Sequence, residues 1–387
     1  MGVRIPTVVA SLLLMGAGST YVESSVVKGL KFLARHQAED GSWGARRSSC
    51  MCPRGTWASW KTPQFLKVDP VIREQVRVLM ERLDHESIEE RDQALNDLAR
   101  IGIPAGPQLE AAAASGTDEL SLRAGDALIR IIGEPADLEL TALAVLAIMG
   151  AGYAPNSRDA FSGICFGEVV RKGLLWIVST LENVGPIDEG NARVRIVATL
   201  AMTEAWSLTE LEEWKEASLK ALEGFDAFVS KDVRTLAWKG LLVRSIEVGK
   251  LPTPGLGLRE LSEILEGQAG DLAFSSSFLL RAWSKGATDS ARQGNLLNLH
   301  TVSTDPETAW FAAMAGWRWN SVAPSLWSTR SGDFLRALND VEIQDPRRCE
   351  CGSWDGDGLK GRLRNSALRL LTLEACYRYT ASMAAGD

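Results

Sequence analysis

The chain has 387 residues, of which 45% are apolar and 24% charged, the composition of a globular protein with room for one large domain or two. A formal net charge of −7 makes sequence-independent nucleic-acid binding a poor match, and three histidines are too few for a His-rich metal or proton-relay site. No apolar run reaches the length that spans a bilayer, so we expect no transmembrane segment.

The N-terminus permits two interpretations. An apolar run from Val8 to Met15 follows Arg4, as in a secretory signal peptide. However, residues 7–18 match residues 141–152 at seven of twelve positions, and an internal copy cannot be a signal peptide. We therefore expect a structural helix here and a cytoplasmic protein. Export is the alternative if the run is a signal peptide.

A pair of helices recurs along the chain. An inner helix rich in Ala, Gly, Leu and Thr is followed by an amphipathic outer helix with a charged face. The predicted pairs are residues 7–18 with 22–38, 139–152 with 166–182, 192–206 with 210–229, 232–248 with 257–267, and 305–317 with 322–340. Residues 271–299 form a less regular pair, and the last helix, at 363–380, has no outer partner after it. No run predicts a β-strand, so the pattern indicates an all-α fold of about six helical hairpins.

One segment, residues 69–134, departs from this plan. It carries far more charge than its surroundings and contains no tryptophan. Ser87 and Glu90 have the spacing of a capping box at the start of an amphipathic helix. The segment resembles HEAT-type repeats, which present surfaces for protein contacts. We predict an inserted helical-repeat module at 69–134 within a discontinuous domain made of residues 1–68 and 135–387.

The stretch from residue 28 to residue 43, KGLKFLARHQAEDGSW, reads as half of an amphipathic helix that Asp40, Gly41 and Ser42 end in a turn. It resembles the QW motif, (K/R)-G-x2-(F/Y/W)-(L/I/V)-x3-Q-x3-G-x-W, at every specified position, namely Lys28, Gly29, Phe32, Leu33, Gln37, Gly41 and Trp43. That motif belongs to the squalene and oxidosqualene cyclases and the wider terpenoid cyclase and protein prenyltransferase α/α-toroid superfamily.

Later parts of the chain look like degenerate copies of the same motif. Residues 172–177 keep its first half and residues 352–354 keep its end. Residues 307–320 and the C-terminal tail resemble bacterial prenyltransferase/squalene-oxidase repeat proteins. The resemblance covers most of residues 7–67 and 135–380, and it implies an α/α-toroid of about six hairpins.

The resemblance also implies a role for the motif residues. In the family, the Gln amide bonds a neighbouring helix end and the Trp ring stacks upon it, which ties adjacent hairpins together. We therefore expect Gln37, Gly41, Trp43 and Trp354 to stabilise the fold rather than to contact a ligand.

The catalytic signatures of the family are missing from the sequence. Class II cyclases protonate an alkene with a DxDD motif, which this chain lacks. The nearest acidic pair is Asp355 and Asp357, which either form a turn or share a proton or a cation. Protein prenyltransferases hold a catalytic zinc with Asp, Cys and His, and no such set occurs at the family spacing.

Four of the six cysteines form two C-x-C pairs, Cys50 with Cys52 and Cys349 with Cys351. If the hairpins close into a ring, the first and last units become neighbours and the two pairs meet at the seam. A structural zinc site is one expectation for four thiolates there. Disulfides, if the protein is exported, and free thiols are the alternatives. No other cofactor is predicted.

Two more sets of side chains are candidates for the wall of a central cavity. Trp310 and Trp317 are seven residues apart and so share a helix face, which in a toroid either binds a hydrophobic small molecule or packs against other helices. Glu374 and Tyr377, three residues apart on the last helix, form a candidate polar pair.

These observations support two main hypotheses of function. The first is a non-catalytic binding or scaffold protein that engages a partner protein through the inserted module or the toroid cavity. The second is a terpenoid cyclase or prenyltransferase-class enzyme with an atypical active site. A third is a carbohydrate-active enzyme, by analogy with other α/α-toroids. The substrate, the partner and the oligomeric state do not follow from the sequence.

Overall fold

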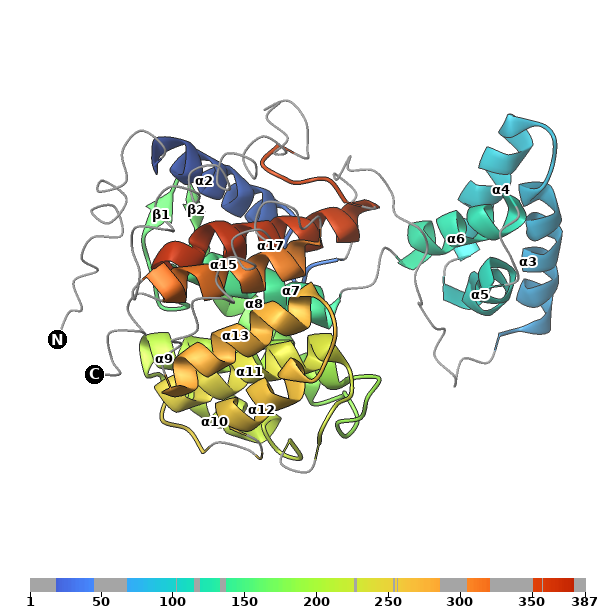
Figure 1. Cartoon of the computed structure of the whole chain (residues 1–387). Coiled ribbons are helices and arrows are strands. Elements are labelled where there is room, and N and C mark those ends of the chain that lie inside the picture. Colours follow the sequence, from blue (N-terminus) through green and yellow to red (C-terminus); the bar gives the residue numbers. More distant parts are fainter. Residues whose placement is uncertain are drawn as a thin grey trace. The chain divides into compact units, whose positions relative to one another are not determined.

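The computed structural model describes residues 19–44, 68–101, 103–114, 119–132, 137–225, 228–252, 255, 257–285, 305–320, 351–356 and 358–378. The chain divides into two compact units, residues 1–43 with 137–387 and residues 44–136 (Figure 1). The segment predicted as an insert, 69–134, lies within the second unit, which we call the module.

The predicted all-α class is confirmed. Helices make up most of the described residues, and the strands found among them are β1 (Ala160–Phe161) and β2 (Ile164–Cys165). These two pair antiparallel around a turn in which Ser162 and Gly163 both have positive φ, 51° and 79°. The expectation that no run forms a β-strand is therefore wrong at these four residues, because two-residue strands are too short to leave an alternating pattern. In the described residues, no helix is long and apolar enough to cross a membrane.

Six described helices of the first unit contact one another in a closed sequence (Figure 1). They are α7 (Leu138–Gly150), α9 (Ala192–Thr209), α11 (Val233–Val248), α13 (Asp271–Lys285), α15 (Pro306–Asn320) and α17 (Gly358–Arg378). Each contacts the next, and α17 contacts α7. Residues 140–150 of α7 are all buried, because its side chains are small or aliphatic on every face and neighbouring helices can cover all of them.

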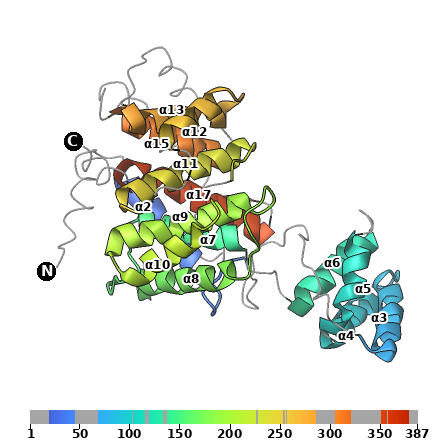
Figure 2. The ribbon, with the colours of Figure 1, turned by 90° about the horizontal axis from the view of Figure 1, so that it is seen from below.

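Amphipathic helices pack against these six helices. They are α2 (Ser19–Arg35) against α17, α8 (Phe166–Leu181) against α7, α10 (Glu212–Ala221) against α9, and α12 (Leu258–Glu266) against α13 and α11. Figure 2 shows α8 and α10 on the same side of α7 and α9. The outer partner of the last helix is therefore α2, from the opposite end of the chain. The predicted helices at 7–18 and 322–340 lie outside the described residues.

The predicted helix at 210–229 proved too long, since α10 ends at Ala221 and a turn follows in which Gly224 has φ +85°. The other described helix ranges agree with the prediction to within a few residues, except that the last helix begins at Gly358 rather than residue 363. Of the pair predicted at residues 271–299, α13 accounts for 271–285, and the rest lies outside the described residues.

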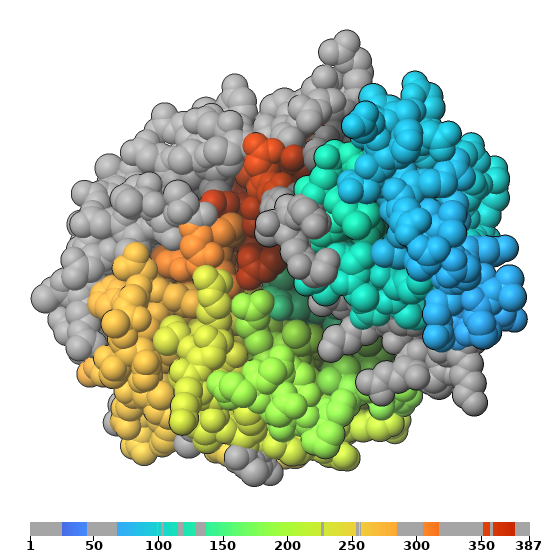
Figure 3. Space-filling model, turned by 90° about the vertical axis from the view of Figure 1, so that its right-hand side faces the viewer, coloured from blue at the N-terminus to red at the C-terminus, as the bar shows by residue number. Residues whose placement is uncertain are grey.

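The module contains α3 (Pro70–Leu83), α4 (Ile88–Ile101), a short 3₁₀ turn at Ile103–Ala105, α5 (Gly106–Ala114) and α6 (Glu119–Ile132). Its own apolar core includes Val76, Leu83, Leu98, Leu109 and Leu128. Helix α3 begins with Asp69, whose side chain accepts a hydrogen bond from the Val71 amide, followed by Pro70. The Ser87 hydroxyl accepts from the Glu90 amide at 3.4 Å, which is half of the predicted capping box. Figure 3 shows α3 and α4 at the surface of the module, in blue and cyan.

Candidate functional site

The best-matched motif of the sequence forms a loop that joins three helices. Nε2 of Gln37 donates to the Gly41 carbonyl at 3.0 Å and to the Val169 carbonyl of α8 at 2.8 Å. The buried Trp43 donates from Nε1 to the Leu33 carbonyl at 2.8 Å and from its amide to Oγ1 of Thr141, on α7, at 2.9 Å. The side-chain N–H groups of Gln37 and Trp43 and the Trp43 amide all donate to protein oxygens. The loop therefore connects α2 to α7 and α8.

Glycine is required in this loop for two reasons. Gly41 has φ +96°, a conformation that other residues rarely adopt. A Cβ atom at this position would lie 2.3 Å from the Lys172 carbonyl oxygen of α8. The Ser42 amide donates to Oδ1 of Asp40 at 3.0 Å, which completes the predicted turn.

The degenerate copy near the C-terminus repeats this contact on another helix. Gly352 has φ +88°, and a Cβ there would lie 2.3 Å from the Lys28 carbonyl oxygen of α2. The amide of the buried Trp354 donates to Oγ of Ser366 at 3.1 Å, as the Trp43 amide does to a hydroxyl on α7. The Gly-Ser-Trp half of one copy thus docks on the Lys-Gly half of the next. This explains why residues 172–177 need to keep only the first half of the motif and residues 352–354 only the second.

The aromatic candidate Trp310 is placed in helix packing. It is 1% exposed, and its ring centroid lies 4.7 Å from that of Trp238 on α11 and 5.2 Å from that of Phe311. Trp317 lies on α15, but its side chain is outside the described residues.

The remaining predicted site residues are spread over several places. Asp355 is 85% exposed in its side chain and pairs with Arg362 at 3.0 Å, while Glu374 is buried on α17. The side chain of Tyr377 lies outside the described residues, as does Asp357.

Of the four C-x-C thiols, only Cys351 is described. It is buried, and its carbonyl accepts from Nη2 of Arg35 on α2 at 2.7 Å. Cys50, Cys52 and Cys349 lie outside the described residues, so the zinc site stays a prediction. Within the described part of the chain, no group of three His, Cys, Asp or Glu residues could hold a metal ion.

The structure brings together a set of charges that sequence reasoning missed. At the starts of four helices, α7, α9, α11 and α15, and in the second turn of α17 lies the ion network, defined as Glu139, Arg193, Arg234, Glu307 and Arg364. Arg193 contacts Glu139 at 2.7 Å and Arg364 contacts Glu307 at 3.0 Å. Glu307 is fully buried and also accepts hydrogen bonds from Arg234 and from Nε1 of Trp238. Because Trp238 also packs against Trp310, the network lies next to the aromatic cluster around Trp310.

Burial shapes the electrostatics of this network. It raises the pKa of Glu139 above its ordinary value, against the opposing charges of Arg193 and Arg364, and the like charge of Glu307 adds to the rise. Oε1 of Glu139 is buried with no hydrogen-bond partner among the described residues. A carboxyl group in this situation is a candidate proton donor, although its other oxygen is held by Arg193.

A sequence signal for the network exists in hindsight. In several inner helices, a capping side chain is followed two residues later by a charge, as in Asp137 with Glu139 and Asp305 with Glu307. The caps are ordinary: Oδ1 of Asp137 accepts from the Leu140 amide at 3.0 Å, and Oδ2 of Asp305 accepts from the Thr308 amide at 3.1 Å. The second residue after a cap points toward the neighbouring helix starts only if the helices are arranged side by side, and the spacing alone does not show that arrangement.

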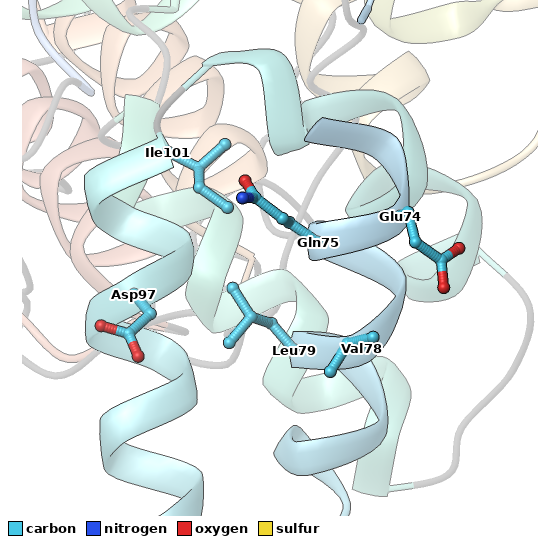
Figure 4. A pocket seen from close by; sticks show the side chains of 6 residues that line it. All are labelled: Glu74, Gln75, Val78, Leu79, Asp97 and Ile101. Carbon is cyan, nitrogen blue, oxygen red and sulfur yellow. The ribbon is translucent and has the colours of Figure 1, made fainter. Parts of the chain in front are cut away.

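The module carries an open pocket of about 430 Å³ between α3 and α4, which we call the α3–α4 groove (Figure 4). Gln75, Leu79 and Ile101 point into the space between the two helices, and Glu74, Val78 and Asp97 complete the lining. Along α3, Val71 and Val78 are 66% and 42% exposed. The groove therefore combines the apolar Leu79 and Ile101 with the polar Gln75, and it has carboxylates at its margin.

No family model, curated protein or solved structure matches the chain.

Proposed function

We propose that the protein is a non-catalytic binding protein, in which an α/α-toroid serves as a scaffold and a HEAT-like module engages a partner protein. The observation that carries this proposal is the α3–α4 groove. It is open and is lined by the exposed Val78, and Val71, seven residues earlier on the same helix, is exposed as well. Apolar side chains held in water at the rim of an open pocket are typical of surfaces that bind other proteins.

The toroid part of the proposal is supported by the closed sequence of contacts from α7 through α17 and back to α7. The two loop contacts support it as well. Gly41 docks on α8 and Gly352 docks on α2, as expected if each hairpin is tied to the next by one motif. The contact between Gly352 and α2 joins the two ends of the chain, which is the joint that a ring requires.

The scaffold role is favoured by how the candidate residues are used. Gln37, Trp43 and Trp354 donate to protein atoms, and Trp310 packs against Trp238. Side chains that hold helices together are not free to contact a substrate.

An enzyme of the terpenoid cyclase or prenyltransferase class is the second candidate. Glu139 favours it, because a buried carboxyl group with a raised pKa is what acid catalysis on an alkene would use in place of DxDD. Arg193 weakens this candidate, because its hydrogen bond to Oε2 at 2.7 Å stabilises the ionised form, which cannot donate a proton. We therefore place the scaffold role first.

Affinity capture from the source cells tests the proposal. The full chain is compared with a variant in which a short Gly linker replaces residues 44–136; the Trp43 carbonyl accepts from the Asp137 amide at 2.9 Å, so the linker has little distance to bridge. We expect at least one partner to bind the full chain and to be lost from the deletion variant. The same set of partners on both proteins would refute the role of the module.

A further inference from the structure

We propose that the α3–α4 groove binds a basic amphipathic helix of its partner protein. This inference rests on the proposed function and specifies the chemistry of the partner. It is carried by three features of the module: the charge of its helical part, residues 69–134, the exposed aliphatic side chains along α3, and its all-helical make-up in the described residues.

The charge of the helical part of the module favours a cationic ligand. Residues 69–134 hold fourteen Asp and Glu against seven Lys and Arg, a net charge of −7. The remainder of the chain, which includes the five Lys and Arg of residues 44–68, is balanced. A surface with this excess attracts basic segments and repels phosphate-rich partners such as nucleic acid and anionic membranes.

Of the two carboxylates at the groove, Glu74 is the more accessible to a ligand cation. Its side chain is 63% exposed and pairs with Arg77, which is 53% exposed, whereas Asp97 is 26% exposed and binds Arg100 and Gln93. A pair between solvent-exposed side chains is weak, so a ligand Lys or Arg can share or replace Arg77 at little cost.

The apolar features match the anchors of a helix. Val71 and Val78 are seven residues apart on α3 and therefore lie on one face, with Leu79 and Ile101 at the floor of the groove. A ligand helix presents apolar side chains at the same spacing, i, i+3 or i+4, and i+7. The fourteen residues of α3 extend over about 21 Å, enough for roughly four turns of a bound helix.

A bound helix fits better than a bound strand. An extended peptide gains affinity by adding to the edge of a sheet, and the described residues of the module contain helices and a 3₁₀ turn but no strand. The ligand must therefore satisfy its own backbone groups, which a helix does.

A displayed library of random peptides, long enough for about four helical turns, tests the inference on the full chain. Selection is made on the unmodified protein with counter-selection against the full-chain variant Val78→Asp. We expect the enriched peptides to carry net positive charge and apolar residues at helical spacing, and Val78→Asp to weaken their binding at least about tenfold. Leu122→Asp changes an aliphatic residue of the module that is 64% exposed but does not line the groove, and it should leave affinity within about twofold.

Charge reversal provides a second arm. Glu74→Lys should weaken the selected peptides and reduce the salt dependence of binding, whereas Glu119→Lys, at a 71% exposed position of α6 outside the groove lining, should do neither. Neutral or acidic selected peptides, no enrichment at all, or equal losses in Val78→Asp and Leu122→Asp would overturn the inference. So would self-association of the chain that Val78→Asp abolishes, since the occupant would then be a second copy. A partner that is captured from cells through the module, without enrichment of basic helices, would leave the proposed function standing and reject this inference alone.

Discussion

At the scale of single residues, glycine at two positions allows the loops to approach a neighbouring helix. Gly41 and Gly352 have φ of +96° and +88°, and each faces a lysine carbonyl that a Cβ would meet at 2.3 Å. The restriction therefore has two parts, a backbone conformation and a close approach. Gly152 has almost the same φ, +95°, but nothing lies within 4 Å of its Cβ position. This difference makes Gly152 a matched control.

We predict that Gly41→Ala lowers the free energy of unfolding by about 2–5 kcal/mol, from left-handed strain and overpacking together. Gly152→Ala should cost only the strain, about 1–2 kcal/mol. Chemical denaturation followed by tryptophan fluorescence measures both. Equal losses would mean that the contact between Gly41 and Lys172 is not tight.

At the scale of helices, the ion network places charges where the helix dipole acts. Glu139 and Glu307 lie in the first turns of α7 and α15, where the partial positive charge of the helix start favours a carboxylate. Arg193 and Arg234 lie at the starts of α9 and α11, where the dipole disfavours a cation. Their carboxylate partners, Glu139 and Glu307, offset this unfavourable interaction with the dipole. Because these partners lie on other helices, the network links helices that are not adjacent in sequence.

The raised pKa of Glu139 predicts a pH dependence of stability. Because the pKa of Glu139 is higher in the folded than in the unfolded protein, folding favours its protonated form. Its contribution to the free energy of unfolding is therefore fully present below the ordinary Glu range, near pH 4. The contribution is lost as pH rises through the folded pKa. Burial is the main cause of the raised pKa; Arg193 and Arg364, which face the group, oppose the rise, and Glu307 adds to it. We expect the stability of the unmodified protein, relative to Glu139→Gln, to fall as pH rises above this range.

Denaturation curves at a series of pH values provide the measurement. Glu168→Gln, at an exposed position of α8, controls for the loss of one carboxylate. A constant difference between the unmodified protein and Glu139→Gln would only report the acceptor lost by Arg193. A difference that rises with pH would contradict the prediction, since the ion pair would then dominate over burial.

At the scale of the whole molecule, the two units have separate cores. The module core around Val76 and Leu98 is formed by module residues, and the Trp43 carbonyl meets the Asp137 amide at 2.9 Å within the first unit. Two of the thirteen tryptophans, Trp57 and Trp60, fall in the module, so tryptophan fluorescence reports mainly on the first unit, while circular dichroism reports on both.

We predict that each unit folds without the other. Replacing residues 44–136 by a short Gly linker should preserve a cooperative fluorescence transition, with a midpoint within a few degrees of the full chain, because it leaves every first-unit contact in place. The isolated segment 69–132 should be helical and unfold cooperatively. Loss of cooperative unfolding in the deletion variant would mean that the module supports the first unit.

The sequence alone determined the helices, because burial on one face or on all faces leaves a periodic pattern that survives without any knowledge of neighbours. It also predicted the loop at Trp43, whose residues are consecutive and whose turn chemistry is local. Only the tertiary structure decided which residues contact one another: that Gly352 docks on α2, that Trp310 packs against Trp238, and that charges from five helices meet around Glu139 and Glu307. These are contacts between residues far apart in the chain, and no periodicity within one helix records which helix lies beside it.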